Sequence, residues 1–230
     1  MSKNAMSIED MRVSALFESG KSITWDLLKE LEWPWEALGL ISAYINELGA
    51  KLDASEYDIR ENNVRIHKSA KIAPSAFIGS NVIIGADTEV RHCAFIRNDV
   101  IVGNGAVIGN STELKNVILF DKVQVPHYNY VGDSILGYKS HFGAGVITSN
   151  VKSDSSLVSV KYGSEIIDTD RKKFGAIVGD NVEIGCNAVL NPGTVIGANA
   201  TVYPLSMVRG FVPADSIYKK QGDIASKRPL

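Results

Sequence analysis

The sequence predicts an all-β fold built on a parallel β-helix, and two regular series of aliphatic residues are the basis for this prediction. In the first series an aliphatic residue returns at every sixth position from Ile66 to Leu114, and in the second it does so from Val178 to Val208. This period fits neither a helix nor an ordinary strand pair. Four positions after most of these residues stands a small or β-branched one, so both classes are expected to face inward. Hexapeptide repeats of this kind are typical of solenoids.

Glycine follows the aliphatic residue in seven of the repeats, and we expect it to supply unusual backbone angles at tight corners. These glycines are Gly79, Gly85, Gly103, Gly109, Gly179, Gly185 and Gly197. A sandwich of short strands is the alternative fold, but it predicts irregular spacing and period-two alternation. The unbroken spacing of six therefore favours the β-helix.

Residues 1–62 lack the repeat and are predicted to form a short α-helical N-terminal segment. We expect helices over residues 23–32 and 35–52, separated at Trp33-Pro34, because proline suits the first turn of a helix. The second helix carries an aliphatic face, which is expected to pack on the end or side of the β-helix. A short helical contact between subunits is the alternative, since the face also follows heptad positions. It consists of Leu38, Ile41, Ile45, Leu48 and Leu52.

The rest of the chain divides at changes in this pattern. Polar residues near 53–62 are expected to link the helices to a β-helix over residues 63–212, followed by a tail, 213–230, that caps its open end. The hexads stop over about 151–175, which indicates a long insertion, either a loop or a small hairpin. Between Leu114 and Thr148 the repeat is irregular, and its candidate inward residues are Leu119, Val125, Val131, Leu136 and Phe142.

Composition narrows the classes of partner and location. The chain has 230 residues, 45% of them hydrophobic, and a net charge of −2. It can bury a substantial core, and its charge gives no reason to expect nucleic acid or an anionic membrane as a partner. The two cysteines fit reduced thiols, and residues 1–10 show no signal sequence. We therefore expect a cytoplasmic protein with no membrane-spanning segment.

Polar residues gather in the irregular stretch. Glu113 and His127 are 14 residues apart, and so are His127 and His141, which is close to one shortened coil. Because coils stack about 4.8 Å apart, these three residues are expected to lie along one edge. A histidine beside a carboxylate is a candidate general base, whereas a lone histidine is more often a structural hydrogen bonder. From the spacing alone, both interpretations stay open.

A family resemblance decides between them. The repeats resemble those of the hexapeptide-repeat acyltransferases, which form a left-handed parallel β-helix. The stretch from Arg97 to Gly145 resembles the acetyltransferase domain of the bifunctional bacterial enzyme that makes UDP-N-acetylglucosamine. The matching pattern is an arginine, Glu-x-Lys, His-x-x-Tyr-x-Gly-Asp, Gly-Ala-Gly and a later asparagine. With the flanking coils, the resemblance covers about residues 64–212.

The resemblance implies an acetyltransferase that uses acetyl-CoA and needs no metal. His127 would be the general base that accepts a proton from the amine of glucosamine 1-phosphate or a related amino sugar, and Glu113 would orient its ring. The acceptor would be bound by Arg97, Lys115, Tyr130, His141 and Lys173. The coenzyme would contact Ala144, Asn150 and Cys186, and a backbone amide near Gly143 would stabilise the oxyanion. The family also implies a homotrimer with sites between subunits.

Three departures from the family pattern keep other functions open. His141 replaces a sugar-binding asparagine, Cys186 replaces a serine that contacts the coenzyme, and the 151–175 insertion exceeds the family's short turn. A non-catalytic scaffold or sugar-nucleotide-binding β-helix is therefore the main alternative. A nucleotidyltransferase is disfavoured, because helices are predicted near the start of the chain and no glycine-rich nucleotide-binding loop is found there. A zinc hydratase of the γ-carbonic anhydrase kind is disfavoured by the spacing of the four histidines.

Overall fold

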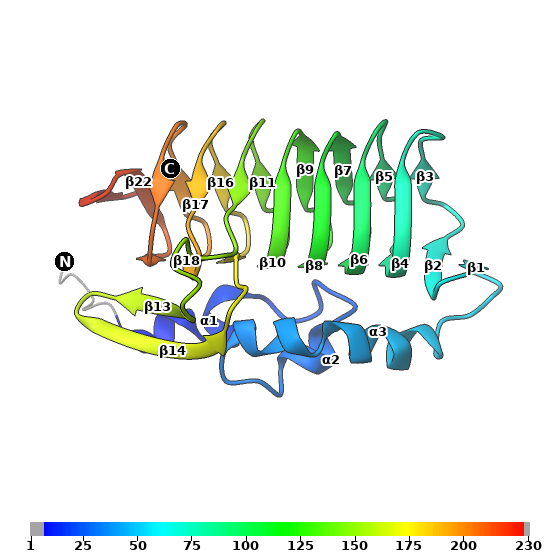
Figure 1. The fold of residues 1–230 in the computed structure, drawn as a ribbon, viewed down its shortest axis with the longest axis horizontal. Helices are drawn as coiled ribbons and strands as arrows, with labels where there is room; N and C mark the ends of the chain where they lie inside the picture. Colours follow the sequence, from blue (N-terminus) through cyan, green and yellow to red (C-terminus); the bar gives the residue numbers. More distant parts are fainter. Residues whose placement is uncertain (1–6, 228–230) are drawn as a thin grey trace.

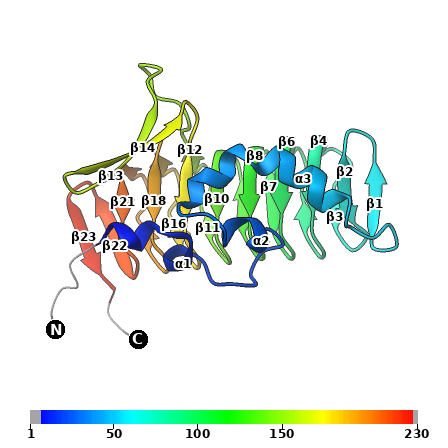
Figure 2. The same ribbon diagram turned by 90° about the horizontal axis from the view of Figure 1, so that it is seen from below.

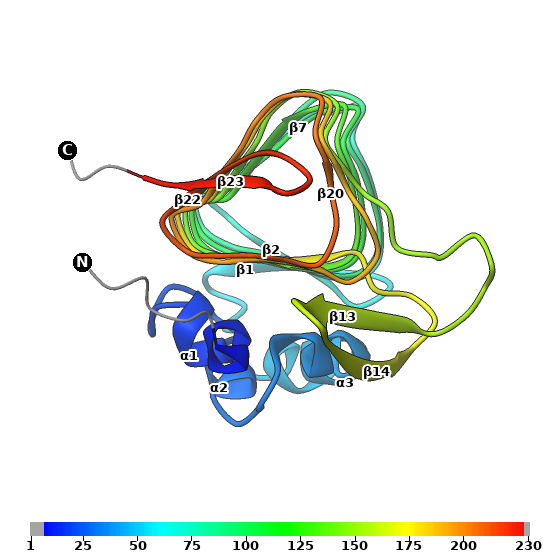
Figure 3. The ribbon, with the colours of Figure 1, turned by 90° about the vertical axis from the view of Figure 1, so that its left-hand side faces the viewer.

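Residues 7–227 form a three-sided parallel β-helix with a helical segment packed along one side, as described by a computed structural model (Figure 1). Seen end-on, the coils superpose as a triangle, and the helices lie beneath one of its sides (Figure 3). The predicted all-β solenoid is thus confirmed. Across the described residues 7–227, no helix is long and apolar enough to cross a membrane.

The helical segment contains short elements only. They are η1 (Ile8–Met11), α1 (Val13–Leu16), α2 (Trp25–Leu28), η2 (Pro34–Gly39) and α3 (Ile41–Gly49). The two expected helices are therefore shorter than the sequence predicts. The second is divided because Pro34 starts a 3₁₀ turn that ends at Gly39, and there the backbone lies so close to Arg171 that a Cβ would stand 2.9 Å from its Nη1.

Within residues 7–227, the strands form a larger sheet, a smaller sheet and a separate hairpin. The larger sheet contains β1 (Tyr57–Arg60), β2 (Val64–His67), β4 (Phe77–Ile84), β6 (Phe95–Val102), β8 (Glu113–Leu119), β10 (Tyr130–Leu136), β12 (Ile147–Thr148), β15 (Ala176–Val178), β17 (Val189–Leu190), β18 (Thr194–Ile196), β20 (Met207–Val208) and β21 (Phe211–Val212). The smaller contains β3 (Lys71–Ile72), β5 (Glu89–Val90), β7 (Val107–Asn110), β9 (Gln124–His127), β11 (His141–Phe142), β16 (Glu183–Ile184), β19 (Thr201–Val202), β22 (Ser216–Lys220) and β23 (Asp223–Ser226). Neighbouring coils pair in parallel, whereas β1 with β2 and β22 with β23 pair antiparallel at the two ends.

The corners are made by residues in the left-handed conformation, which recur once per coil in three columns. Asparagine and aspartate tolerate this conformation better than other side chains. The columns are Asn63, Asn81, Asp99, Asn116 and Asp133; Asp87, Gly105, Lys122, Lys139, Asn181, Asn199 and Asp215; and Cys93, Ser111, Tyr128, Gly145, Asn187 and Leu205. Their non-glycine members have φ between 48° and 61°. Within the columns, side chains hydrogen-bond from coil to coil, as from Asn81 Nδ2 to Asp99 Oδ1 at 2.6 Å.

The expectation that the seven repeat glycines supply unusual angles is wrong. None of them has a positive φ, and each stands two residues before a corner residue that does. Glycine is needed there because the next coil passes too close. A Cβ on Gly109 would lie 1.6 Å from the carbonyl oxygen of Pro126, and one on Gly79 would lie 2.1 Å from that of Arg97.

The residues predicted to face inward form the core. The five candidates of the irregular stretch, from Leu119 to Phe142, are fully buried, so the prediction there is confirmed. Of the two regular series, all but Ile72 and Ile78 are buried as well. Both exceptions lie in the first coil, where the stack has a neighbour on one side only.

A second buried column faces outward from the β-helix. Its members alternate with inward residues along their strands, yet their exposure is 0%: Ile83, Ile101, Ile118, Ile135, Ile177 and Val195. The N-terminal segment covers this face, with α3 against β4, β6 and β8 and η2 against β10 (Figure 2). Leu38, Ile41 and Ile45 of the aliphatic helix face are buried in the contact. That face therefore packs on the side of the β-helix, as its favoured interpretation predicts.

The insertion leaves and rejoins the β-helix at one corner, between β12 and β15. It contains an antiparallel hairpin, β13 (Val158–Tyr162) and β14 (Glu165–Arg171), so the hairpin interpretation is confirmed. The hairpin lies beside the helices beneath the same face (Figure 3). At the far end, β23 crosses the opening of the triangle (Figure 3). Residues 228–230 of the predicted cap lie outside the described residues.

Ile118→Ala is expected to destabilise the protein by about 2–4 kcal/mol, because it removes a fully buried side chain between β8 and the N-terminal segment. Urea unfolding followed by circular dichroism measures the loss. Ile147→Ala is the matched control, since Ile147 is 40% exposed on an uncovered face. Equal losses in the two variants would show that the N-terminal segment does not pack on this column.

Gly109→Ala is expected to prevent folding, because no side-chain rearrangement relieves a contact with the backbone of Pro126. Gly105→Asn, at φ +63° with its nearest neighbour atom 3.6 Å from the new Cβ, is expected to change stability by less than about 1 kcal/mol. Soluble yield and thermal melting compare the two. A folded Gly109→Ala protein with wild-type melting would refute the close-approach explanation.

Candidate functional site

Four of the predicted site residues gather on one outer face of adjacent coils. In the register of β8 and β10, Glu113 lies opposite Tyr130, and Lys115 lies opposite Gly132. Arg97 stands one coil earlier, just after the pair of Ile96 with Leu114. Coils stack about 4.8 Å apart, so these side chains are neighbours. The β-helix thus converts separations of 16 or 17 residues into a single polar surface.

One ion pair joins two of these residues, and a second joins Lys115 to Asp133. Arg97 Nη1 donates to Glu113 Oε1 at 2.9 Å, and Lys115 Nζ donates to Asp133 Oδ1 at 3.0 Å. The Arg97–Glu113 pair is on the surface, with side chains 42% and 32% exposed. The side chains of Lys115 and Asp133 are only 18% and 3% exposed. The Lys115 ammonium is therefore positioned and largely neutralised by its own chain.

Asp133 is the centre of a buried hydrogen-bond network. Besides Lys115, it accepts hydrogen bonds from Asn116 and Asn150, and Asn150 Nδ2 also donates to the Tyr130 hydroxyl at 3.2 Å. Burial raises the pKa of Tyr130, so its hydroxyl stays protonated near neutral pH. The Tyr130 oxygen accepts from Asn150, which leaves its hydrogen to donate to another acceptor. Sequence reasoning quoted Asp133 in a motif but missed its central position.

His127 lies on the neighbouring face, and its expected pairing with Glu113 is not formed. His127 ends β9 of the smaller sheet, opposite Asn110, and the left-handed corner at Tyr128 separates it from Tyr130. Its ring takes part in none of the hydrogen bonds or ion pairs described for residues 7–227, whereas Glu113 pairs with Arg97. Glu113 and His127 flank the same corner column, at Ser111 and Tyr128, but on adjoining faces. His141 does not continue this edge, because a coil here has 17 residues and not 14, so His141 lies opposite Gln124.

His141 lies apart from the polar surface, whereas Lys173 precedes Phe174, whose amide donates to the Asn150 carbonyl at 3.0 Å. His141, in β11, places its Nδ1 2.8 Å from Glu183 Oε2, beside Lys122 and Lys139 in a shallow hollow. Lys173 is exposed at the end of the insertion, where its carbonyl accepts from Arg171 Nε at 3.4 Å.

The residues predicted to bind the coenzyme do not form one group. Ala144 and Cys186 meet on adjacent coils, since the Ala144 carbonyl accepts from Asn187 and a Cβ on Gly143 would lie 2.9 Å from Cys186 Sγ. Cys186 is an exposed free thiol. Asn150 instead belongs to the network around Asp133.

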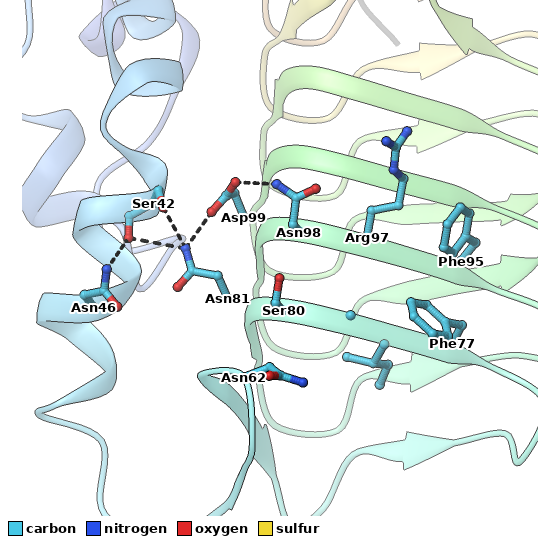
Figure 4. A pocket seen from close by; sticks show the side chains of 12 residues that line it. Ser42, Asn46, Asn62, Phe77, Ser80, Asn81, Phe95, Arg97, Asn98 and Asp99 are labelled. Carbon is cyan, nitrogen blue, oxygen red and sulfur yellow. Dashed lines mark hydrogen bonds between the residues drawn. The ribbon is translucent and has the colours of Figure 1, made fainter.

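A groove that the sequence did not predict lies between α3 and the β-helix, beside Arg97 (Figure 4). Its volume is about 840 Å³. One side is closed by a contact between α3 and the corner column, since Asn81 Nδ2 donates to Ser42 Oγ at 3.0 Å and to Asp99 Oδ1 at 2.6 Å. On its other side stand Phe77 and Phe95, whose rings are 5.5 Å apart and 57% and 43% exposed. Two phenylalanines at outward hexad positions were the signal for it.

Comparison with known proteins places the chain in a family. Residues 87–213 match the family model described as the GMPPB C-terminal domain. The chain belongs to this family. The GMPPB C-terminal domain match covers the irregular stretch, the insertion and the later coils, and it contains all the predicted site residues. This match and the relatives described below together confirm the resemblance to hexapeptide acetyltransferase domains.

Curated relatives are similar over part of their length. The bifunctional protein GlmU of Methanococcus maripaludis is 34% identical over 219 residues, which are 93% of this chain and 53% of that protein. The bifunctional sugar-1-phosphate nucleotidylyltransferase/acetyltransferase of Sulfurisphaera tokodaii is 35% identical over 109 residues, 47% of this chain and 27% of that protein. This member of the GMPPB C-terminal domain family thus spans about half, or less, of the relatives it matches.

Solved structures show weaker similarity. The acetyltransferase domain of PglB from Neisseria gonorrhoeae FA1090, in complex with acetyl coenzyme A, is 16% identical with a TM-score of 0.31, over 83% of this chain and 67% of that one. The polySia specific acetyltransferase NeuO is 13% identical with a TM-score of 0.41, over 69% of this chain and 80% of that one.

Asp133→Ala is expected to lower the free energy of unfolding by about 3–5 kcal/mol, because it leaves the partly buried Lys115 without its counter-charge. Asp99→Ala is the matched control. It occupies the same corner column and accepts hydrogen bonds only from Asn81 and Asn98, so about 1 kcal/mol is expected. Urea unfolding compares the variants. If both lose the same amount, the Lys115 pair does not stabilise the site.

Proposed function

We propose that this chain is an acetyltransferase domain that transfers acetyl from acetyl-CoA to the amine of an amino sugar phosphate or sugar nucleotide. The observation that carries the proposal is the polar surface on which Arg97, Lys115 and Tyr130 meet, in a member of the GMPPB C-terminal domain family. Similarity to the bifunctional sugar-1-phosphate nucleotidylyltransferase/acetyltransferase of Sulfurisphaera tokodaii supports the same reaction.

Arg97, Lys115 and Tyr130 are proposed to hold the phosphate of the acceptor. Both cations face the same outer surface, and the Tyr130 hydroxyl has a hydrogen available for a phosphate oxygen. Glu113 is reassigned from His127 to Arg97, whose guanidinium it holds in place. Asn150 is likewise reassigned from the coenzyme to the acceptor side, because it supports Tyr130 and Asp133.

His127 is proposed to accept the proton of the attacking amine. The amine nitrogen forms a bond to the thioester carbonyl carbon, the C–S bond then breaks, and the proton passes from the imidazolium to the leaving CoA thiolate. A backbone amide near Gly143 and Ala144 stabilises the oxyanion. Cys186 and His141 keep their proposed contacts with coenzyme and acceptor. Lys173 is proposed to act in the site of a neighbouring subunit, within a cytoplasmic homotrimer.

A non-catalytic sugar-nucleotide-binding or scaffold domain is the second candidate, and the ion pairs favour it. Arg97 and Lys115 are each neutralised by a carboxylate of the same chain, which weakens them as phosphate ligands. As for the zinc hydratase alternative, the described part of the chain contains no group of three His, Cys, Asp or Glu side chains placed to hold a metal ion.

His127→Asn is expected to lower kcat about 10²- to 10⁴-fold with little change in KM, because it removes the proton acceptor and leaves the phosphate ligands. Release of CoA thiol from acetyl-CoA measures turnover, with glucosamine 1-phosphate and nucleotide-linked amino sugars as acceptors. His92→Asn is the control, since the His92 ring bonds to Ser75 Oγ at 2.9 Å, two coils away from His127. No turnover by the wild type with any acceptor would favour the scaffold.

A further inference from the structure

A second polar pocket lies under the insertion, and it begins at Ser149, two coils beyond Lys115. Its volume is about 370 Å³, and it is formed where residues 149–154 arch out from the corner and β13 passes back over the last coils (Figure 2). Three cations line it, together with serine hydroxyls and an asparagine. The residues that matter below are Ser149, Lys152, Lys161, Asn191 and Arg209.

The pocket is built on a rigid framework. Val158 and Val160 of β13 are buried against the β-helix, and the rings of Tyr162 and Phe211 lie 5.5 Å apart. The strand approaches so closely that only glycine fits beneath it. A Cβ on Gly193 would lie 2.7 Å from the Ser159 oxygen, and one on Gly210 would lie 2.9 Å from the Lys161 oxygen. Lys161 therefore projects from a docked strand.

The charges in the pocket are not balanced. Its one carboxylate, Asp154, accepts from the backbone and hydroxyl of Ser156 at 2.9 and 2.7 Å. Lys152 is partly engaged, because its Nζ donates to the Leu157 carbonyl at 2.8 Å. Among the interactions described for residues 7–227, the side chains of Lys161 and Arg209 have neither a hydrogen bond nor an ion pair. Like charges held together in this way are stabilised by a bound anion.

The cationic end of the pocket, at Arg209, is too far from Lys115 to share one phosphate with it. Ser149, Asn191 and Arg209 continue the outward column of Lys115, because Thr148 pairs with Leu190 and Leu190 with Val208. Arg209 is four coils beyond Lys115, which at about 4.8 Å per coil is roughly 19 Å. A sugar phosphate bound at Lys115 does not span this distance, so an anion here occupies a separate position.

We propose that this pocket binds the phosphate or diphosphate group of a nucleotide, with Lys161 and Arg209 as its principal ligands. Two cations and adjacent hydroxyl and amide groups match the charge and the acceptor oxygens of a phosphate. Such a group comes from two sources, the phosphorylated nucleotide end of coenzyme A or the diphosphate of a sugar nucleotide. The site goes beyond the proposed acetyl transfer and does not require that the chain be catalytic.

Isothermal titration calorimetry tests the proposal with adenosine 3′,5′-diphosphate and, separately, with UDP and GDP. The full chain is expected to bind at least one of these probes. The double variant Lys161→Gln/Arg209→Gln is expected to bind it about 10- to 100-fold more weakly. The control is Lys71→Gln/Lys220→Gln, which removes two exposed cations outside every groove described above. It is expected to bind as the wild type does.

Which probes bind shows which source the phosphate group comes from, and whether the proposal fails. Preference for adenosine 3′,5′-diphosphate assigns the pocket to the coenzyme, and preference for UDP or GDP assigns it to a sugar nucleotide. Absence of binding to all three probes overturns the proposal, as does equal binding by wild type and double variant. Thermal melting confirms that the variants are folded. Because no acceptor or turnover is involved, these outcomes are independent of whether acetyl transfer occurs.

Discussion

The contact between successive coils is the constraint on which the rest of the structure depends. Parallel pairing sets the distance between coils, and at that distance a backbone passes directly over each repeat glycine. Two residues later the chain turns through a left-handed corner, where Asn and Asp side chains link one coil to the next. Glycine and asparagine thus have different tasks in one hexad, the first permitting the stack and the second turning it. The polar surface exists because this stack places Arg97, Glu113 and Tyr130 side by side.

One side of the triangle is buried on both of its faces. The runs Val82–Ile84, Val100–Val102 and Val117–Leu119 are apolar at every position, as is typical of a parallel sheet covered on both sides. The covering layer is the N-terminal segment, and further along it is the hairpin β13–β14. Helices too short to be stable alone are held here by the aliphatic column beneath them. The candidate site is on an adjoining side, which leaves it open.

Much of the fold follows from the sequence, because a period of six repeated over many coils has few structural solutions. The inward residues were predicted even where the period falters, since Leu119 and Phe142 keep their apolar character. The glycines were misinterpreted, because their reason lies in the adjacent coil and not in the local chain. The outward column was missed, although runs of three consecutive aliphatic residues at 82–84, 100–102 and 117–119 were its signal. Helix lengths were overestimated because local propensity does not report the 3₁₀ turn at Pro34.

The candidate site was predicted less completely than the fold. Matching motif residues were enough to bring Arg97, Lys115 and Tyr130 together, but not to assign their partners. Glu113 pairs with Arg97, because the length of the coil, and not the spacing of the motif, places Glu113 opposite Phe95, two residues from Arg97. Asp133 was overlooked since its importance comes from burial and from three donor groups that meet only in three dimensions.

Arg171 connects parts of the chain that are otherwise separate. It is the last residue of β14, and its guanidinium lies against Gly39 of η2. Burial lowers the pKa of Arg171, and the charge of Asp133 opposes that effect. One side chain therefore joins the hairpin, the helical segment and the carboxylate beneath the polar surface. A solenoid trimmed of its first fifty residues would lose the wall that shields this junction from water. Ligand affinities measured on such a fragment would describe a rehydrated surface and not the one that the intact chain presents.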